Sequence, residues 1–107
     1  MERVIANDSV RLEDMRPGET REVVFRVDDP ADYDRVVSVR AGCGCTRATY
    51  DYKAGEVRVS YEAQSVPEHL RAQGYYEPVK YLEVEFMGED GMRTSQTLQF
   101  QVRISGR

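Results

Sequence analysis

The sequence predicts an all-β protein that folds as one antiparallel sandwich of about seven strands. Valine dominates the aliphatic residues, with 14 Val against 4 Leu and 2 Ile, and valine favours strands. Apolar and polar residues alternate in several segments, which is typical of strands that bury one face. The 107 residues form a single domain, residues 1–107, because two independent cores would not fit.

The N-terminal half contains four of the expected strands, of which the first and the last have the weaker patterns. A Pro17-Gly18 turn separates the first two strands, and an acidic loop beginning at Asp28-Asp29-Pro30 follows the second. The expected inward faces are Val10 and Leu12 in residues 9–13, Val23, Phe25 and Val27 in residues 20–27, Val37 and Val39 in residues 35–40, and Ala48, Tyr50 and Tyr52 in residues 46–52.

The C-terminal half contains three strands and one long connection. Hairpin turns are expected at Lys53-Ala54-Gly55 and at residues 88–91. The connection from Ala63 to Pro78 is long enough to be functional, and residues 67–72 within it are expected to form one helical turn. The expected inward faces are Val57, Val59 and Tyr61 in residues 56–62, Leu82, Val84 and Phe86 in residues 81–86, and Leu98, Phe100, Val102 and Ile104 in residues 98–104.

Composition excludes several classes of protein. No apolar run approaches the roughly 20 residues that a transmembrane helix needs. The net charge of −4 argues against nucleic acid as a partner, because phosphate binding depends on clustered positive charge. Residues 1–8 lack the apolar core of a signal peptide, so we expect a cytoplasmic location in the producing cell, with the periplasm as the alternative if a leader was removed.

The segment Ala41-Gly42-Cys43-Gly44-Cys45-Thr46 is the most unusual local feature. Its glycines permit a tight corner, and the spacing of the cysteines leaves three interpretations open. The thiols pack as small hydrophobic groups, they form a disulfide, or they bind a metal. A zinc site would need ligands beyond Cys43, Cys45 and His69, the only histidine, whereas a two-coordinate soft metal such as Cu(I) would not.

The remaining candidates for a site are tyrosines and an acidic loop. Tyr75 and Tyr76 end the long connection and Tyr81 points outward from the next strand, so the three form a candidate patch for binding a partner. Alternatively, they fold back over the edge of the sandwich. The four carboxylates of residues 28–34 lack the glycine and distal glutamate of a calcium-binding EF-hand loop, which favours a solvated turn.

The residues 41–46, followed by the alternating strand at residues 55–61, resemble a bacterial domain-of-unknown-function family marked by a Cys-Gly-Cys-Thr motif. Residues 80–84 and 98–106 are similar to that family's later strands, so the resemblance covers the chain from about Pro17 to Gly106. It implies an immunoglobulin-like β-sandwich, similar to domains of pilus chaperones and sperm-protein-like modules, and implies no enzyme. The chain departs from the family at Ala54-Gly55, where Pro-Gly is usual, and in lacking the export signal of many members.

No set of residues converges on a catalytic site, so the sequence predicts a non-enzymatic structural or interaction module without a cofactor. We expect a subunit of a larger assembly, bound to protein partners or forming a homo-oligomer. An accessory protein of a virus capsid or tail fits this description, and such a protein would be incorporated into the virion. The alternative from a different class is a metal-binding or thiol-redox protein that acts through Cys43 and Cys45.

Overall fold

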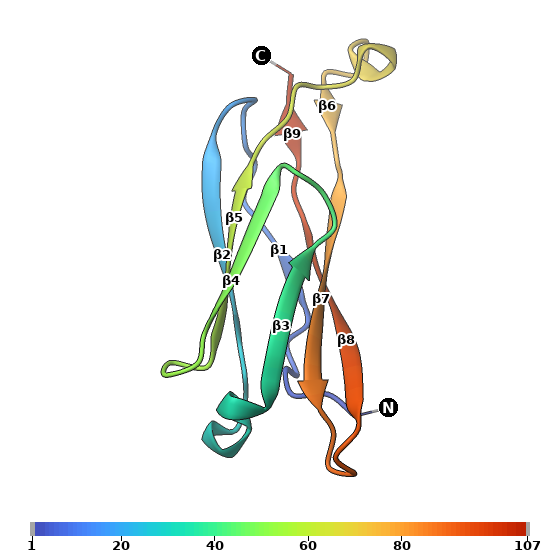
Figure 1. Ribbon diagram of the computed structural model, residues 1–107. Coiled ribbons are helices and arrows are strands. Elements are labelled where there is room, and N and C mark those ends of the chain that lie inside the picture. Colours follow the sequence, from blue (N-terminus) through green and yellow to red (C-terminus); the bar gives the residue numbers. More distant parts are fainter. Residues whose placement is uncertain (1, 107) are drawn as a thin grey trace.

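Strands β7 (Val79–Met87) and β8 (Arg93–Gln101) form the longest hairpin of the protein, paired without interruption from Val79 opposite Gln101 to Met87 opposite Arg93. The structure is a computed structural model that describes residues 2–106, and its two larger sheets pack face to face as a β-sandwich (Figure 1). The fold is therefore all-β, as the alternating sequence pattern predicts. The molecule is elongated, with extents of 51 × 23 × 20 Å.

The first sheet has the strand order β1-β8-β7-β3 and the second has the order β2-β5-β4. All seven expected segments contain a strand. Two very short strands pair with each other beyond the end of the first sheet (Figure 1). The remaining strand bounds are β1 (Ser9–Arg11), β2 (Thr20–Arg26), β3 (Val36–Ala41), β4 (Thr46–Asp51), β5 (Glu56–Glu62), β6 (Tyr75–Tyr76) and β9 (Ile104–Ser105).

The core lies between the two sheets and consists of the alternate residues of each long strand. Tyr61 and Phe100 meet there edge to face, with ring centroids 5.3 Å apart. The alternation correctly predicts most of this core, because the pleat directs every second side chain inward. The buried apolar residues are Val4, Ile5, Met15, Val23, Phe25, Val27, Val57, Val59, Tyr61, Ala63, Val66, Leu82, Val84, Phe86, Leu98, Phe100, Val102 and Ile104.

Three expectations about the strands are wrong in detail. Val37 is not a core residue but is 44% exposed, because the register shifts between Val36 and Ser38 and this irregularity changes which side chains face inward. Strand β4 ends at Asp51, so Tyr52 lies beyond it and is 63% exposed. The sheets are also not entirely antiparallel, since β1 pairs parallel to β8.

Two short 3₁₀ helices occupy the expected loops. Helix η1 (Pro30–Arg35) forms in the acidic loop, where the Asp29 carboxylate accepts a hydrogen bond from the Ala31 N–H. Helix η2 (Glu68–Leu70) supplies the helical turn expected in the long connection. Gly55 closes the β4–β5 hairpin with a φ of +66°, and a Cβ there would overlap the Tyr33 ring, so this turn requires glycine.

The N-terminal segment closes one open side of the sandwich. Val4 and Ile5 are buried, and their N–H groups donate to Oε1 of Gln96, a buried residue of β8, at 3.1 and 3.2 Å. Gln96 Nε2 donates in return to the Ile5 carbonyl. On the second sheet's side, Ala6 N–H donates to Asp28 at 2.7 Å, just after β2. We call this closure, made by Val4, Ile5, Ala6, Asp28 and Gln96, the N-terminal seam.

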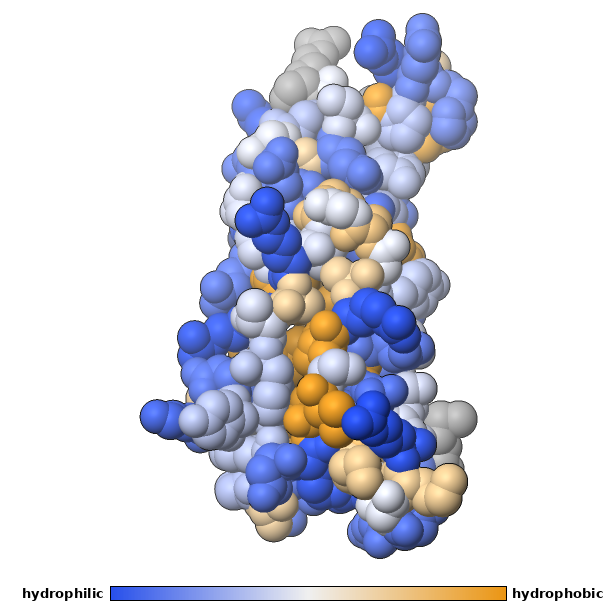
Figure 2. Space-filling model, in the orientation of Figure 1, coloured by the Kyte–Doolittle hydropathy of each residue, from blue (hydrophilic) through white to orange (hydrophobic). Residues whose placement is uncertain are grey.

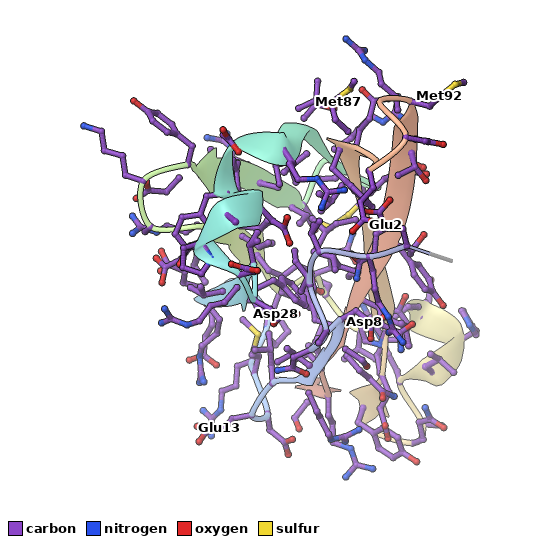
Figure 3. The ribbon with its side chains drawn as sticks, turned by 90° about the horizontal axis from the view of Figure 1, so that it is seen from below. Glu2, Asp8, Glu13, Asp28, Met87 and Met92 are labelled. Carbon is purple, nitrogen blue, oxygen red and sulfur yellow. A yellow bond between two sulfur atoms is a disulfide. The ribbon has the colours of Figure 1, made fainter. Side chains whose placement is uncertain are left out.

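Glu2 and Arg35 connect the N-terminal segment, helix η1 and the β7–β8 turn at one end of the molecule. Glu2 accepts from the Glu89 N–H in the β7–β8 turn and forms an ion pair with Arg35. Arg35 also donates to Asp32 and to the Met87 carbonyl. Seen from below, Glu2 lies beside the hairpin that carries Met87 and Met92 (Figure 3). The hydrogen bond from Arg35 holds the pKa of Glu2 below its usual range, which burial only partly offsets.

Candidate functional site

The cysteine segment forms the turn that carries the chain from β3, at the edge of one sheet, to β4, at the edge of the other. The Gly42 N–H donates to the Tyr81 carbonyl at 3.1 Å and continues the pairing of β3 with β7. A Cβ at Gly42 would lie 3.0 Å from that carbonyl oxygen, so the approach favours glycine. Within the turn, Cys43 and Cys45 form a disulfide with their Cα atoms 5.5 Å apart.

Thr46 connects the disulfide to the sandwich. Its side chain is 5% exposed, and its hydroxyl oxygen lies 3.4 Å from Cys43 Sγ and 3.7 Å from Cys45 Sγ. The backbone of the turn is held too, because Thr46 N–H donates to the Cys43 carbonyl and Glu62 N–H donates to the Cys45 carbonyl. The motif was found from the sequence, but the contact made by its threonine was missed, because only the folded turn places the hydroxyl beside both sulfurs.

Each half of the disulfide borders its own hollow in the surface. The hollow beside Cys43 has a volume of about 190 Å³, and the hollow beside Cys45 is larger, at about 420 Å³. Both cysteines are half-buried, so the disulfide is neither enclosed in the core nor fully exposed. The smaller hollow is lined by Gly42, Cys43, Val79, Lys80 and Tyr81, and the larger by Thr20, Gly44, Cys45, Arg47, Ser60, Glu62, Ala63 and Gln64.

The structure does not assemble a metal site from the candidate ligands. His69 is exposed on η2, and no group of three His, Cys, Asp or Glu side chains within residues 2–106 is arranged to hold a metal ion. Metals bind cysteine as the thiolate, whereas each of these sulfurs is bonded to the other. Of the three interpretations of Cys43 and Cys45, the disulfide is the one that the structure contains.

The three candidate tyrosines lie on two different strands. Tyr75 and Tyr76 form β6 and are half-buried, whereas Tyr81 is on β7 and is 54% exposed. The guanidinium of Arg103 lies 4.1 Å from the centroid of the Tyr75 ring, which favours a cation–π interaction. Arg103 also donates two hydrogen bonds to Glu77 and lowers the pKa of that carboxyl. Tyr81 therefore has the most accessible ring of the three.

The side of the sandwich opposite the N-terminal seam is left open. Strands β3 and β4 lie side by side there, and neither has a further strand on its outer edge within the described residues. Figure 2 shows hydrophobic surface along β3 in the middle of this face, with hydrophilic side chains on both sides. We define the β3–β4 seam by exposed Val37 and half-buried Val39, Ala48 and Tyr50.

Sequence reasoning missed the β3–β4 seam because it assigned Val37 to the core and expected Val39, which does pack against the core, to be fully buried. A signal was present in the adjacent pair Val36-Val37, since neighbouring residues of a strand point to opposite faces and both cannot be buried in one core. Tyr50 anchors the seam to helix η1 by donating its hydroxyl to the Tyr33 carbonyl at 2.5 Å. Burial raises the pKa of Tyr50 to about 12, with smaller contributions from Tyr33, Asp34 and Asp51.

The carboxylates of the acidic loop are largely engaged with the protein itself. Asp28 accepts from Ala6, Asp29 caps η1, and Asp32 pairs with Arg35. Their oxygens satisfy backbone and guanidinium donors, which is the structural role expected of a turn.

The fold and the turn together describe a β-sandwich with a disulfide at the junction of two strand edges that are unpaired within residues 2–106. In comparisons with known proteins, no family model matches the chain and no curated protein is significantly similar to it. The resemblance to the Cys-Gly-Cys-Thr family, and the immunoglobulin-like fold that it implies, therefore stay predictions. None of the helices among residues 2–106 has the length and apolar character needed to cross a membrane.

Proposed function

We propose that the protein is a non-enzymatic interaction module that joins a larger assembly through the β3–β4 seam. The observation that carries this proposal is the difference between the sandwich's two open sides. One side is closed by the chain's own Val4 and Ile5, whereas on the other the outer edges of β3 and β4 are unpaired within residues 2–106 and Val37 of β3 is exposed. Unpaired edges with apolar side chains are surfaces to which another strand readily adds.

The backbone of β3 supports pairing with an added strand. The N–H and carbonyl groups of successive residues point alternately to the two sides of a strand. Because the Gly42 N–H points to β7, the amide groups of Ala41 and Val39 point away from β7, toward the open edge. A partner strand would satisfy these groups and cover the apolar side chains of the seam in the same step.

The partner that fits this edge is an extended segment of another protein. A second copy of this chain is the alternative partner, and its binding would make the protein a homo-oligomer. The acidic net charge of −4 supports a protein partner over nucleic acid. A virus particle, with a capsid- or tail-accessory role for this chain, is one assembly of this kind.

The location of the protein is part of the proposal. The cytoplasm of the producing cell is one proposed location. The Cys43–Cys45 disulfide supports the periplasmic alternative instead, because disulfides persist mainly in oxidising compartments. Alkylation of free thiols in intact producing cells, before lysis, distinguishes the two, since only an oxidising compartment keeps the pair protected.

The test of the interaction module is native mass spectrometry and affinity capture from the producing cells, comparing the wild type with Val37→Lys. A charge at the open edge should abolish partner binding or self-association while the fold is retained. Val79→Lys is the matched control, since Val79 is similarly exposed, at 38%, but lies on the internal strand β7. If both variants lose binding equally, or if both keep it, the proposed role of the seam is contradicted.

A further inference from the structure

We propose that the Cys43–Cys45 disulfide is a reactive one, which exchanges with the thiols of a dithiol in another protein, and that Thr46 positions the departing sulfur. This inference goes beyond the interaction module and uses different residues. It assigns the disulfide turn as a site for thiol–disulfide exchange, with Cys45 as the sulfur that is attacked and Cys43 as the sulfur that leaves.

The position of the disulfide argues against a mainly structural role. It closes a loop of only three residues, and stabilisation by a disulfide grows with the length of the loop that it closes. The two sheets are already held together by a core of buried residues, and neither cysteine is among them. A disulfide that contributes little to the fold is free to open and close.

The two hollows give the sulfurs the access that exchange needs. An attacking thiolate must approach one sulfur from the side opposite the other. Cys45 borders the larger hollow, of about 420 Å³, which lies at the ends of β2, β4 and β5 and includes Gly44, which has no side chain to block it. Cys43 borders the smaller hollow, of about 190 Å³, on the other side of the turn. An incoming thiolate therefore has more room at Cys45.

Thr46 distinguishes the two sulfurs as leaving groups. Its hydroxyl oxygen is 3.4 Å from Cys43 Sγ and 3.7 Å from Cys45 Sγ, so a donated hydrogen bond favours charge on Cys43. The hydroxyl is buried with its side chain and is held on the first residue of β4, so it needs no rearrangement. Hydrogen bonding to a thiolate lowers its pKa and makes it a better leaving group.

The exchange balances as follows. A thiolate of the partner's dithiol attacks Cys45 Sγ, a bond forms between the two sulfurs, and the Cys43–Cys45 bond breaks with its electron pair leaving on Cys43 Sγ. The partner's second thiolate then attacks the partner sulfur of this mixed disulfide and releases Cys45. The partner is oxidised by two electrons to a disulfide, this chain is reduced to two cysteines, and the two protons of the dithiol end on those cysteines.

The first experiment traps the intermediate in the folded wild-type protein with reduced glutathione as the probe. Samples are quenched with an alkylating agent at intervals, and the modified cysteines are mapped by mass spectrometry. We expect a mixed disulfide on Cys45 with an alkylated Cys43, formed about tenfold or more faster than glutathione exchanges with its own disulfide. Glutathione on Cys43 would overturn the assignment of the attacked sulfur. Reduction that requires denaturant would overturn the whole proposal.

The second experiment tests Thr46 with Thr46→Val, which removes the hydroxyl and keeps the shape. We expect exchange to slow about tenfold, which is the effect of losing one hydrogen bond to a charged sulfur. Thr49→Val is the control, because Thr49 is exposed on the same strand. Equal rates in the two variants would overturn the role of Thr46, provided that circular dichroism shows both folded.

A pH profile separates this role from a merely structural one. In the reduced protein, the ultraviolet absorbance of the thiolate should titrate at higher pH in Thr46→Val than in Thr49→Val. The charged and titratable groups that face the two sulfurs are Arg47 and Glu62 at the larger hollow and Lys80 and Tyr81 at the smaller one. They are the same in both variants, so a shift found only in Thr46→Val reports the hydroxyl. Identical titrations would contradict its donation to Cys43.

Discussion

The two sides of this sandwich differ in whether the chain's own residues cover them. At the N-terminal seam, Val4 and Ile5 are buried, and Gln96 binds the N–H groups of both and the carbonyl of Ile5. At the β3–β4 seam, the edges have no such cover among the described residues, and Val37 is 44% exposed. The difference shows that the chain can close a side of the sandwich with its own residues, and the side that it leaves uncovered is the surface that we propose for a partner.

Each seam also has its own means of attachment. The N-terminal seam depends on buried hydrogen bonds from Val4 and Ile5 to Gln96, which is 92 and 91 positions away in the sequence. At the β3–β4 seam, a short turn with the Cys43–Cys45 disulfide joins the two strands, and the hydroxyl of Tyr50 binds the Tyr33 carbonyl. The core between the seams stabilises both. The loss of unfolding free energy in a core variant is therefore the reference for variants at either seam.

Phe100→Ala should give the largest loss of stability, about 3–5 kcal/mol, because it opens a cavity beside Tyr61 in the fully buried core. Urea unfolding measures this loss. Tyr81→Ala on the neighbouring strand is the control and should cost less than about 1 kcal/mol, since Tyr81 is exposed. A loss below about 1 kcal/mol for Phe100→Ala would mean that the register of β8 is wrong.

Gln96→Leu should destabilise the protein by about 2–4 kcal/mol, because three backbone groups of Val4 and Ile5 would lose their buried partner. Hydrogen exchange should show the amides of Val4 and Ile5 losing protection first. Thr97→Val, at an exposed position on the same strand, should change stability by less than about 0.5 kcal/mol. Unchanged protection in Gln96→Leu would show that apolar burial alone holds the N-terminal seam.

Replacing both cysteines, by Cys43→Ser with Cys45→Ser, should cost only about 1.5 kcal/mol, because the disulfide closes a three-residue loop. Thermal unfolding of the oxidised wild type and of the double variant provides the comparison, with the reduced wild type as the control for the serine hydroxyls. A loss as large as that for Phe100→Ala would identify the disulfide as a main support of the fold.

Tyr50→Phe should cost about 1 kcal/mol at neutral pH, because it removes the hydrogen bond to the Tyr33 carbonyl. Tyr61→Phe is the matched control: the Tyr61 hydroxyl is buried without a hydrogen-bond partner in the described structure, so its removal should leave stability unchanged or higher. Unfolding by urea at pH 7 measures both variants. A greater loss for Tyr61→Phe would reverse the assigned roles of the two hydroxyls.

The pH dependence of the β3–β4 seam follows from the same tyrosine. Burial raises the pKa of Tyr50 from 10.0 to about 12, so the neutral form is favoured in the folded state. Its contribution to stability is fully present below pH 10 and is lost as the pH rises toward 12. Tyrosinate absorbance of the folded protein should show late titration, and Tyr50→Phe should remove part of it, leaving that of Tyr61, whose pKa burial also raises. Ionisation of every tyrosine near pH 10 would contradict the burial of Tyr50.

The sequence by itself determined the all-β class, the seven segments that contain the strands of the two larger sheets, and most of the core. The reason is that alternation, valine content and turn residues act locally, and the pleat turns a period of two directly into a buried face. It also identified the Cys43-Gly44-Cys45 segment as the unusual feature, while leaving its chemistry open among thiols, disulfide and metal.

Only the tertiary structure decided which strands pair at the edges of the sandwich and which side chains cover its two sides. The irregularity of β3 exposes Val37, the parallel pairing of β1 depends on β8, and the burial of Val4 and Ile5 depends on Gln96, more than 90 residues away. Local patterns cannot specify these features, because each depends on which distant segment lies beside an edge. The same holds for Thr46, whose hydroxyl reaches the two sulfurs only once the turn between the sheets is formed.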